Sequence, residues 1–229
     1  MKLKLLFIGM LFLLALPATG QNCSKYYPMQ EGTTLEYTSY NGKGKTQGSV
    51  SYTVANVIEE GSTSSATMVM TYMDEKDKEV FTSDFTYSCT GNTVTIDYES
   101  LMSNQMLEQF SDMEMEVSGT DIELPNDLEV GQELPDANVI MKMSMSGINM
   151  NSQVDMINRK VEKKETVTTP AGTFECYVIY SENQSKMMMA SQNFPSRLWL
   201  AEGVGMIKQE TFKKNGNLMS SMVLTGLSQ

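Results

Sequence analysis

Residues 48–58 read GSVSYTVANVI. Within this stretch Val50, Tyr52 and Val54 alternate with polar residues, which is the period-2 pattern of a strand with one buried and one solvated face. The same alternation recurs at residues 93–98 and 139–146. Turn-forming sequences separate such runs, at 41–44, 74–78, 91–92, 170–172, 202–203 and 215–217. We therefore expect about ten strands, joined mainly as hairpins in an antiparallel meander.

One segment departs from this alternation. Between Glu99 and Met113 the apolar residues follow helical spacing, with no glycine or proline inside the segment. The apolar positions are Leu101, Met102, Met106, Leu107 and Phe110. The sequence thus predicts an all-β protein, an antiparallel meander that forms a strongly curved sheet or half-barrel with one covering α-helix. No linker or repeat divides the chain, so we expect one domain over residues 21–229.

The first twenty residues have the composition of a secretory signal peptide. Two lysines precede an apolar stretch at residues 5–16, and Ala18 and Gly20 supply small residues before a cut. Cys23 is preceded by Gly-Gln-Asn rather than by the small or apolar residues of a lipobox, which does not favour a lipid anchor. No later apolar run approaches the ~20 residues of a membrane helix. We expect an exported protein that is soluble after cleavage and does not span the membrane.

Charge is distributed unevenly along the 229 residues. The chain has 17 Lys and Arg, 28 Asp and Glu, and a net charge of −11, which becomes −13 without the two lysines of the signal peptide. Residues 79–141 contain fourteen carboxylates and no Lys or Arg, whereas the remaining mature chain sums to +1. Such acidity argues against nucleic acid as a partner. It leaves two interpretations of this segment open: a solvated face, or a surface that binds another protein.

Residues that carry catalysis in common enzyme classes are missing. The chain has no histidine, no G-x-S-x-G and no S-x-x-K, which removes Ser-His-Asp and Cys-His chemistry. Paired carboxylates remain open because Asp and Glu are plentiful. We expect a non-enzymatic protein that needs no cofactor. Three cysteines, Cys23, Cys89 and Cys176, allow three alternative disulfides in an exported protein, and the sequence does not choose among them.

Methionine is abundant, with 21 residues in the whole chain. Several occur in M-x-M spacing, which is open to interpretation as a Cu(I) site, an adaptable apolar groove or plain core filling. Calcium in the acidic segment is a further alternative, although no EF-hand spacing is present, and we expect no metal. Met141, Met143 and Met145 face one way along one predicted strand. With Trp199 they are our candidate groove for a lipid-like molecule or an extended peptide.

Three segments resemble a known family. They lie at residues 26–48, at 158–177 (NRKVEKKETVTTPAGTFECY) and at 198–218. In order and spacing they resemble the TapB-like family of exported proteins from Bacteroidota, related to a wider group with a YmcC-like half-barrel. The resemblance implies a β-protein of the periplasm or outer cell envelope, with no established reaction, and the family name denotes association with a tetratricopeptide-repeat protein. The matching positions are Pro170, Gly172, Phe174, Cys176, Gly203 and Gly205, which we interpret as structural turn and core positions.

Overall fold

A computed structural model describes residues 23–98, 114–145, 148–187 and 190–229. The regular secondary structure of the described residues is all β, with no helix, and its strands form one antiparallel sheet. The all-β antiparallel prediction is therefore confirmed. The helix predicted for residues 99–113 and the signal peptide at 1–20 lie outside the described residues. Within the described ranges no helix is long and apolar enough to cross a membrane.

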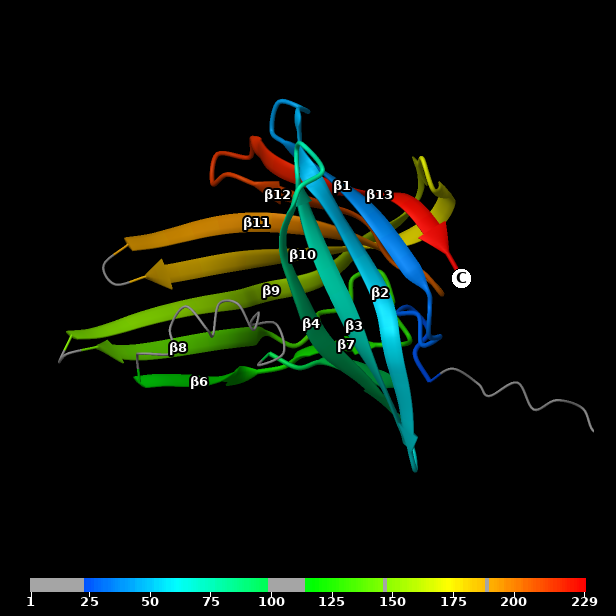
Figure 1. The fold of residues 1–229 in the computed structure, drawn as a ribbon, viewed down its shortest axis with the longest axis horizontal. Helices are drawn as coiled ribbons and strands as arrows, with labels where there is room; N and C mark the ends of the chain where they lie inside the picture. The colour runs from blue at the N-terminus through cyan, green and yellow to red at the C-terminus, as the bar shows by residue number, and fades with distance from the viewer. Residues whose placement is uncertain (1–22, 99–113, 146–147, 188–189) are drawn as a thin grey trace, which may run out of the picture.

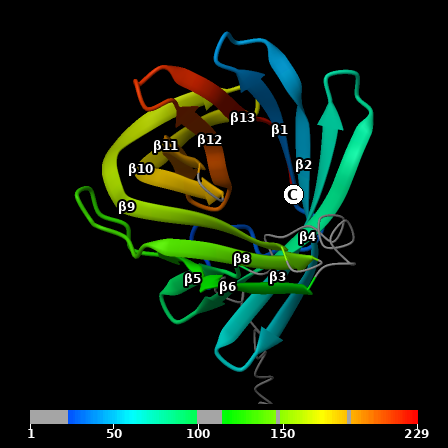
Figure 2. The same ribbon diagram turned by 90° about the vertical axis from the view of Figure 1, so that its left-hand side faces the viewer.

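The sheet contains thirteen strands, more than the number expected from the sequence. In chain order they are β1 (Thr34–Asn41), β2 (Thr46–Glu60), β3 (Thr63–Asp74), β4 (Glu79–Thr90), β5 (Thr93–Ile96), β6 (Glu114–Thr120), β7 (Ile122–Pro125), β8 (Ala137–Met145), β9 (Ile148–Thr169), β10 (Gly172–Met187), β11 (Ala190–Ala201), β12 (Gly205–Phe212) and β13 (Leu218–Ser228). Their order in the sheet is β6-β8-β9-β10-β11-β12-β13-β1-β2-β3-β4-β5-β7. The sheet curls so that β1–β4 face β9–β11 across an interior (Figures 1 and 2).

The hairpins form where turn residues were predicted. Between β1 and β2, the Asn41 side-chain oxygen accepts hydrogen bonds from the backbone N–H groups of Lys43 and Lys45. Asp74 does the same for Lys76 and Lys78 between β3 and β4. A short polar side chain that satisfies the turn backbone holds each pair of strands in register. The predicted meander is thus correct for most of the sheet.

The barrel almost closes where its two edge strands meet. Strands β6 and β7 lie at opposite edges of the sheet, yet only Asp121 separates them in the chain. The Asp121 carboxylate accepts a hydrogen bond from the Tyr98 backbone N–H (3.2 Å), which joins this corner to the end of β5. Gly119 fits beside the Tyr98 ring, where a Cβ atom would come within 3.0 Å. The chain therefore links the two edges covalently at one end of the seam.

An N-terminal segment before β1 is fixed to the barrel at one end. Cys23 forms a disulfide with Cys89 of β4, and Cys176 is a free, buried thiol. The Asn126 side chain donates to the Cys23 carbonyl (2.8 Å) and accepts from the Lys25 N–H (2.8 Å). Tyr26 is fully buried. Of the three alternative disulfides, the structure contains the one that attaches this segment to the sheet.

Candidate ligand-binding cleft

The predicted methionine and tryptophan positions lie far apart in the sheet. Met141 and Met143 are on β8, and Met145 ends that strand, whereas Trp199 is on β11, three strands further along. Through the strand registers, Met141 aligns with Ala190 at the start of β11. Trp199 lies nine residues further along β11, which corresponds to roughly 30 Å. The structure does not bring the tryptophan to these methionines.

Trp199 instead belongs to the packed core and is 5% exposed. Its indole Nε1 donates to the carboxylate of Glu165, and the Lys208 ammonium lies 4.5 Å from the ring centroid. Hydrogen bonds from Lys163 and Trp199 lower the pKa of Glu165. The ring therefore anchors an ionic network to the core, as expected for a buried indole that needs a hydrogen-bond partner.

An apolar cleft of about 420 Å³ opens on the concave side of the sheet. Its lining comes from strands that face each other across the interior and from the N-terminal segment. The lining residues are Tyr27, Leu35, Tyr37, Tyr52, Met68, Met70, Ser83, Phe85, Ile96, Ile122, Leu198, Val204, Met206 and Gln209. None of them carries a formal charge at neutral pH. Methionines do line the concavity, but they are Met68, Met70 and Met206 rather than those of β8.

Aromatic rings form one wall of this cleft. Tyr37 and Tyr52 lie edge to face at 5.5 Å, Tyr52 and Phe85 at 6.0 Å, and Tyr27 contacts Tyr87 at 5.5 Å between ring centroids. These spacings are typical of stabilising aromatic pairs. Burial raises the pKa of Tyr27 to about 12, so its phenol stays protonated at neutral pH. The wall is therefore uncharged, and the Tyr37 hydroxyl donates to the Met206 carbonyl at 2.7 Å.

A buried arginine lines a separate hollow, of about 430 Å³, together with Glu133, Leu134, Asp136, Asn158 and Lys160. Arg159 of β9 is 5% exposed. Its Nη1 donates to the Pro135 carbonyl, and among the described residues its Nε has no hydrogen-bond partner. Burial lowers the pKa of Arg159, while Tyr27 has the largest opposing electrostatic effect. A guanidinium nonetheless stays protonated in proteins, so this is a buried cation.

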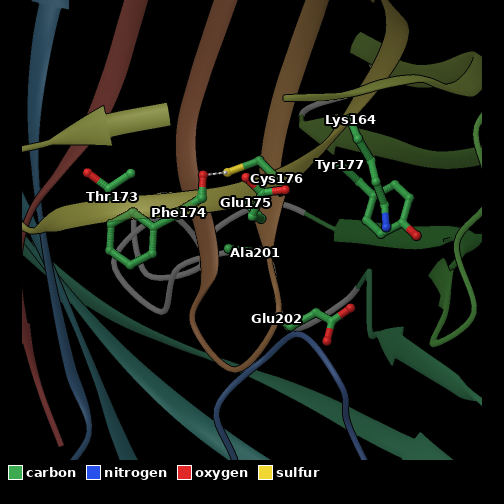
Figure 3. Close-up of a pocket in the computed structure, with 8 residues that line it drawn as sticks. All are labelled: Lys164, Thr173, Phe174, Glu175, Cys176, Tyr177, Ala201 and Glu202. Carbon is green, nitrogen blue, oxygen red and sulfur yellow. Dashed lines mark hydrogen bonds between the residues drawn. The ribbon is translucent and has the colours of Figure 1, made fainter. Parts of the chain in front are cut away.

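A second hollow, of about 380 Å³, surrounds the free cysteine (Figure 3). The Lys164 ammonium lies 4.1 Å from the Tyr177 ring centroid, and Glu202 forms an ion pair with Lys25 (2.9 Å). The Cys176 thiol donates to the Phe174 carbonyl, and burial raises its pKa to about 11. The thiol is therefore protonated at neutral pH and is a poor nucleophile. Several polar groups of this hollow already interact with each other or with the ring.

Comparison with known proteins gives a family and a fold. A family model described as DUF3108-like matches residues 30–224. The chain belongs to the DUF3108-like family. No curated protein matches it.

Two solved structures share the fold of this DUF3108-like chain. One is a Bacteroides fragilis protein assigned as exported, with a YmcC-like fold. It is 20% identical and has a TM-score of 0.72, and the match covers 90% of this chain and 100% of that protein. The other is a Parabacteroides distasonis protein assigned as a lipoprotein. It is 24% identical and has a TM-score of 0.73, and the match covers 91% of this chain and 100% of that protein. At these identities the likeness establishes the fold alone.

The positions that carried the family resemblance are structural in this DUF3108-like protein. Pro170 lies in the tight turn between β9 and β10, and Gly172 (φ 144°) starts β10 with the Phe174 ring packed over it. Gly203 (φ 72°) donates its N–H to the Lys25 carbonyl, and Gly205 (φ 93°) lies beside the Tyr27 ring. The three glycines use backbone conformations that favour glycine. The second pair also seats the N-terminal segment that lines the cleft.

The acidic segment of the DUF3108-like chain is mostly solvated. Nine of its described carboxylates are exposed: Glu79, Asp84, Asp97, Glu116, Glu123, Asp127, Glu129, Glu133 and Asp136. Glu116 forms an ion pair with Lys142 at 3.3 Å. Within the described ranges no group of three or more potential ligand side chains is close enough to hold a metal ion. These carboxylates lie on strands and loops that face solvent.

Proposed function

We propose that this protein is an exported, non-enzymatic binding module that holds one elongated apolar molecule in the cleft. The observation that carries the proposal is the lining of the concave face. Tyr52, Met70, Phe85 and Met206 pack against the core but remain only partly buried. A pocket of about 420 Å³ lies within the size range of small-molecule sites, which are concave and mainly apolar.

The energetics favour an apolar chain over a polar ligand. Each methylene group that leaves water for this lining contributes ~0.8 kcal/mol. The few polar groups at the cleft, such as Ser83 and Gln209, can orient a ligand without offering a charge. Methionine side chains adapt their shape at low cost, which suits a flexible chain. An extended peptide would need more backbone partners than this lining provides.

Export is supported by the signal-peptide pattern and by the disulfide, which is typical of oxidising compartments. The two similar structures are assigned as an exported protein and a lipoprotein. In this chain, the Cys23 sulfur is bonded to Cys89 and cannot also carry a thioether-linked lipid. We therefore propose a periplasmic or outer-envelope protein without a lipid on Cys23. Membership of the narrower TapB-like family is part of the same proposal.

The non-enzymatic interpretation rests on the reactive groups of the chain. Histidine is missing from the sequence. The thiol of Cys176 is buried and its pKa is raised to about 11, so it does not supply a thiolate at neutral pH. The cleft lining contains no acidic or basic side chain that could act as a general acid or base.

Binding of Nile red, a neutral apolar dye, to the purified mature protein tests this function. We expect saturable fluorescence enhancement that Met70→Glu weakens at least tenfold, since the substitution places a carboxylate in the apolar lining. Thr71→Glu is the matched control, because the neighbouring side chain lies on the opposite face of β3, where the Thr71 hydroxyl contacts that of Thr82. Equal effects of both substitutions, or no saturable binding by the wild type, would contradict the proposal.

A second candidate function uses the acidic segment 79–141. The segment exposes nine carboxylates, and this negative charge suits a basic partner, such as a tetratricopeptide-repeat protein of the envelope. Capture of one partner that weakens with salt, and is lost when Glu129, Glu133 and Asp136 are changed to lysine, would support this role. Capture that survives these changes would exclude it.

A further inference from the structure

A hollow of about 590 Å³ lies between two neighbouring turns at one end of the barrel (Figures 1 and 2). One turn joins β1 to β2, and the other joins β12 to β13. Strands β1 and β13 are paired, with Asn41 aligned to Ser220, so the two turns lie side by side. The polar lining of the hollow consists of Asn41, Lys43, Lys213 and Asn217. None of these residues lines the apolar cleft, so the hollow is a separate feature of the molecule.

The positive charge of this hollow is not balanced by acidic groups in its lining. The other two polar hollows each combine their cations with two carboxylates, which are Glu175 and Glu202 in one and Glu133 and Asp136 in the other. The lining between the turns contains two lysines and no carboxylate. Within the described ranges, neither Lys43 nor Lys213 forms an ion pair. In a chain with a net charge of −11, this is a local excess of positive charge.

The adjacent turn between β3 and β4 does carry acidic residues. Glu75 of that turn is already paired with Lys45 at 3.1 Å, and the Asp74 carboxylate accepts backbone N–H groups of its own turn. Asp77 and Glu79 lie beside them, one hairpin further along the sheet from the hollow. The two lysines of the hollow are therefore available to an anion from outside the chain.

The hollow is preformed because both turns are held in place. The side chains of Asn41 and Asn215 each accept backbone N–H groups of their own turn, at 2.9–3.1 Å. Gly42 packs so closely against the other turn that a Cβ atom there would lie 2.2 Å from the Leu218 carbonyl oxygen. The two turns thus meet backbone to backbone. A ligand does not have to bring them together, which lowers the cost of binding.

The unused donors of the hollow suit an anion with several oxygens. Each lysine carries an ammonium group with three N–H donors, and each asparagine carries an amide NH₂ group. Among the described residues, no hydrogen bond uses the ammonium of Lys43 or Lys213 or the amide nitrogen of Asn41 or Asn217. A phosphate group has about two negative charges at neutral pH and at least three acceptor oxygens, whereas a carboxylate has one charge and two oxygens in one plane. Lysine binds phosphate as a point charge, without the planar fork that matches a carboxylate.

We propose that this hollow binds a phosphate group, with Lys43 and Lys213 as its charged ligands and the amides of Asn41 and Asn217 as further donors. The phosphate belongs to a free ion or to the headgroup of a lipid, and both present the same oxygens to the four side chains. The site adds a second class of ligand to the protein and does not depend on the apolar cleft.

An NMR titration of the purified mature protein with inorganic phosphate tests the site, with acetate at equal ionic strength as the comparison. We expect saturable shifts of the backbone N–H signals at residues 41–45 and 213–219, and an affinity for phosphate at least tenfold above that for acetate. Lys43→Gln combined with Lys213→Gln should weaken phosphate binding roughly tenfold or more, since it removes both charged donors. Lys76→Gln combined with Lys160→Gln is the matched control, because it removes two exposed lysines outside the hollow, and it should leave the affinity unchanged.

Cosedimentation with vesicles identifies the source of the phosphate. Binding to phosphatidylcholine vesicles that contain phosphatidic acid, but not to phosphatidylcholine alone, and its loss in the Lys43 and Lys213 double variant would support a lipid headgroup. Binding of inorganic phosphate without binding to these vesicles would support a free ion. Equal affinities for phosphate and acetate, an equal loss in the control variant, or no binding of either form of phosphate would overturn the proposal. Nile red binding should be the same in both double variants, so this outcome would leave the apolar cleft standing.

Discussion

Replacement of Cys23 and Cys89 by alanine removes the bond that attaches the N-terminal segment to β4. The two cysteines are 66 residues apart, and the loop-closure relation gives a loss of roughly 4 kcal/mol for a loop of this length at 25 °C. The hydrogen bonds of Asn126 to this segment persist in the variant and hold it in place. The cost should therefore arise mainly in the unfolded chain, with little change in the folded structure.

Urea unfolding of the oxidised wild type, the reduced wild type and the double variant measures this cost. Reduced wild type and variant should share one lowered midpoint. Cys176→Ala, the control, should keep the full response to reductant, because its thiol is free. A loss below ~1 kcal/mol, or a wild-type midpoint that reductant does not move, would refute the reasoning.

The same bond makes a prediction about lipidation. Mature protein isolated from the envelope and unfolded without reductant should expose one maleimide-reactive thiol, that of Cys176. A thioether-linked lipid on Cys23 would leave Cys89 unpaired and expose two. Mass spectrometry of the same sample identifies the lipid directly, so a count of two thiols with an added lipid mass would show that the disulfide does not form in the cell.

Three further outcomes follow from local geometry. Gly42→Ala should destabilise the fold more than Gly44→Ala in urea unfolding, because a Cβ at Gly42 would lie 2.2 Å from the Leu218 carbonyl oxygen. At Gly44 (φ 77°) the new Cβ would face open space, and alanine there would cost only the backbone strain of about 1–2 kcal/mol. Equal losses would contradict the steric argument. Tyr87→Phe should cost about 1–3 kcal/mol, since it leaves the carbonyl of Pro28 without its buried donor, and a neutral effect in the same assay would show that another group replaces the hydroxyl. The pKa of Cys176 rises from 9.0 to about 11 on folding, so its contribution to stability is complete below pH 9 and is lost as the pH approaches 11. Cys176→Ala should therefore flatten the alkaline decline of the melting temperature. An unchanged decline of melting temperature with pH would assign the effect to the buried tyrosines.

The sequence predicted the β-class and the hairpins because both follow from local patterns. Alternation at residues 48–58 identified β2, and Asn41 and Asp74 marked the turns at which adjacent strands reverse. The near-closure of the barrel could not be predicted in this way. It depends on β6 pairing with β8 while β7 pairs with β5, a choice made by strands distant in sequence on either side of Asp121.

The position of the candidate groove could not be predicted from local patterns either. Residues 141 and 143 do share one face of β8, as the alternation predicts, but which strands lie opposite depends on the register of the whole sheet. Met68 and Met70 have the same M-x-M spacing and line the cleft, because β3 faces β11 and β12 across the interior. Periodicity therefore identifies a face of a strand, whereas tertiary curvature decides whether that face lines a cavity.

Arg159 illustrates why chemistry can be hidden in such a chain. In the sequence it stands among Lys160, Lys163 and Lys164, a run that is typical of a solvated basic surface. The period of the strand places Lys160 outside and Arg159 inside, where its only hydrogen bond to described residues is to the Pro135 carbonyl. Arg159 lines a hollow together with Glu133 and Asp136, which come from the loop before β8, so the alternation along β9 alone could not predict this environment.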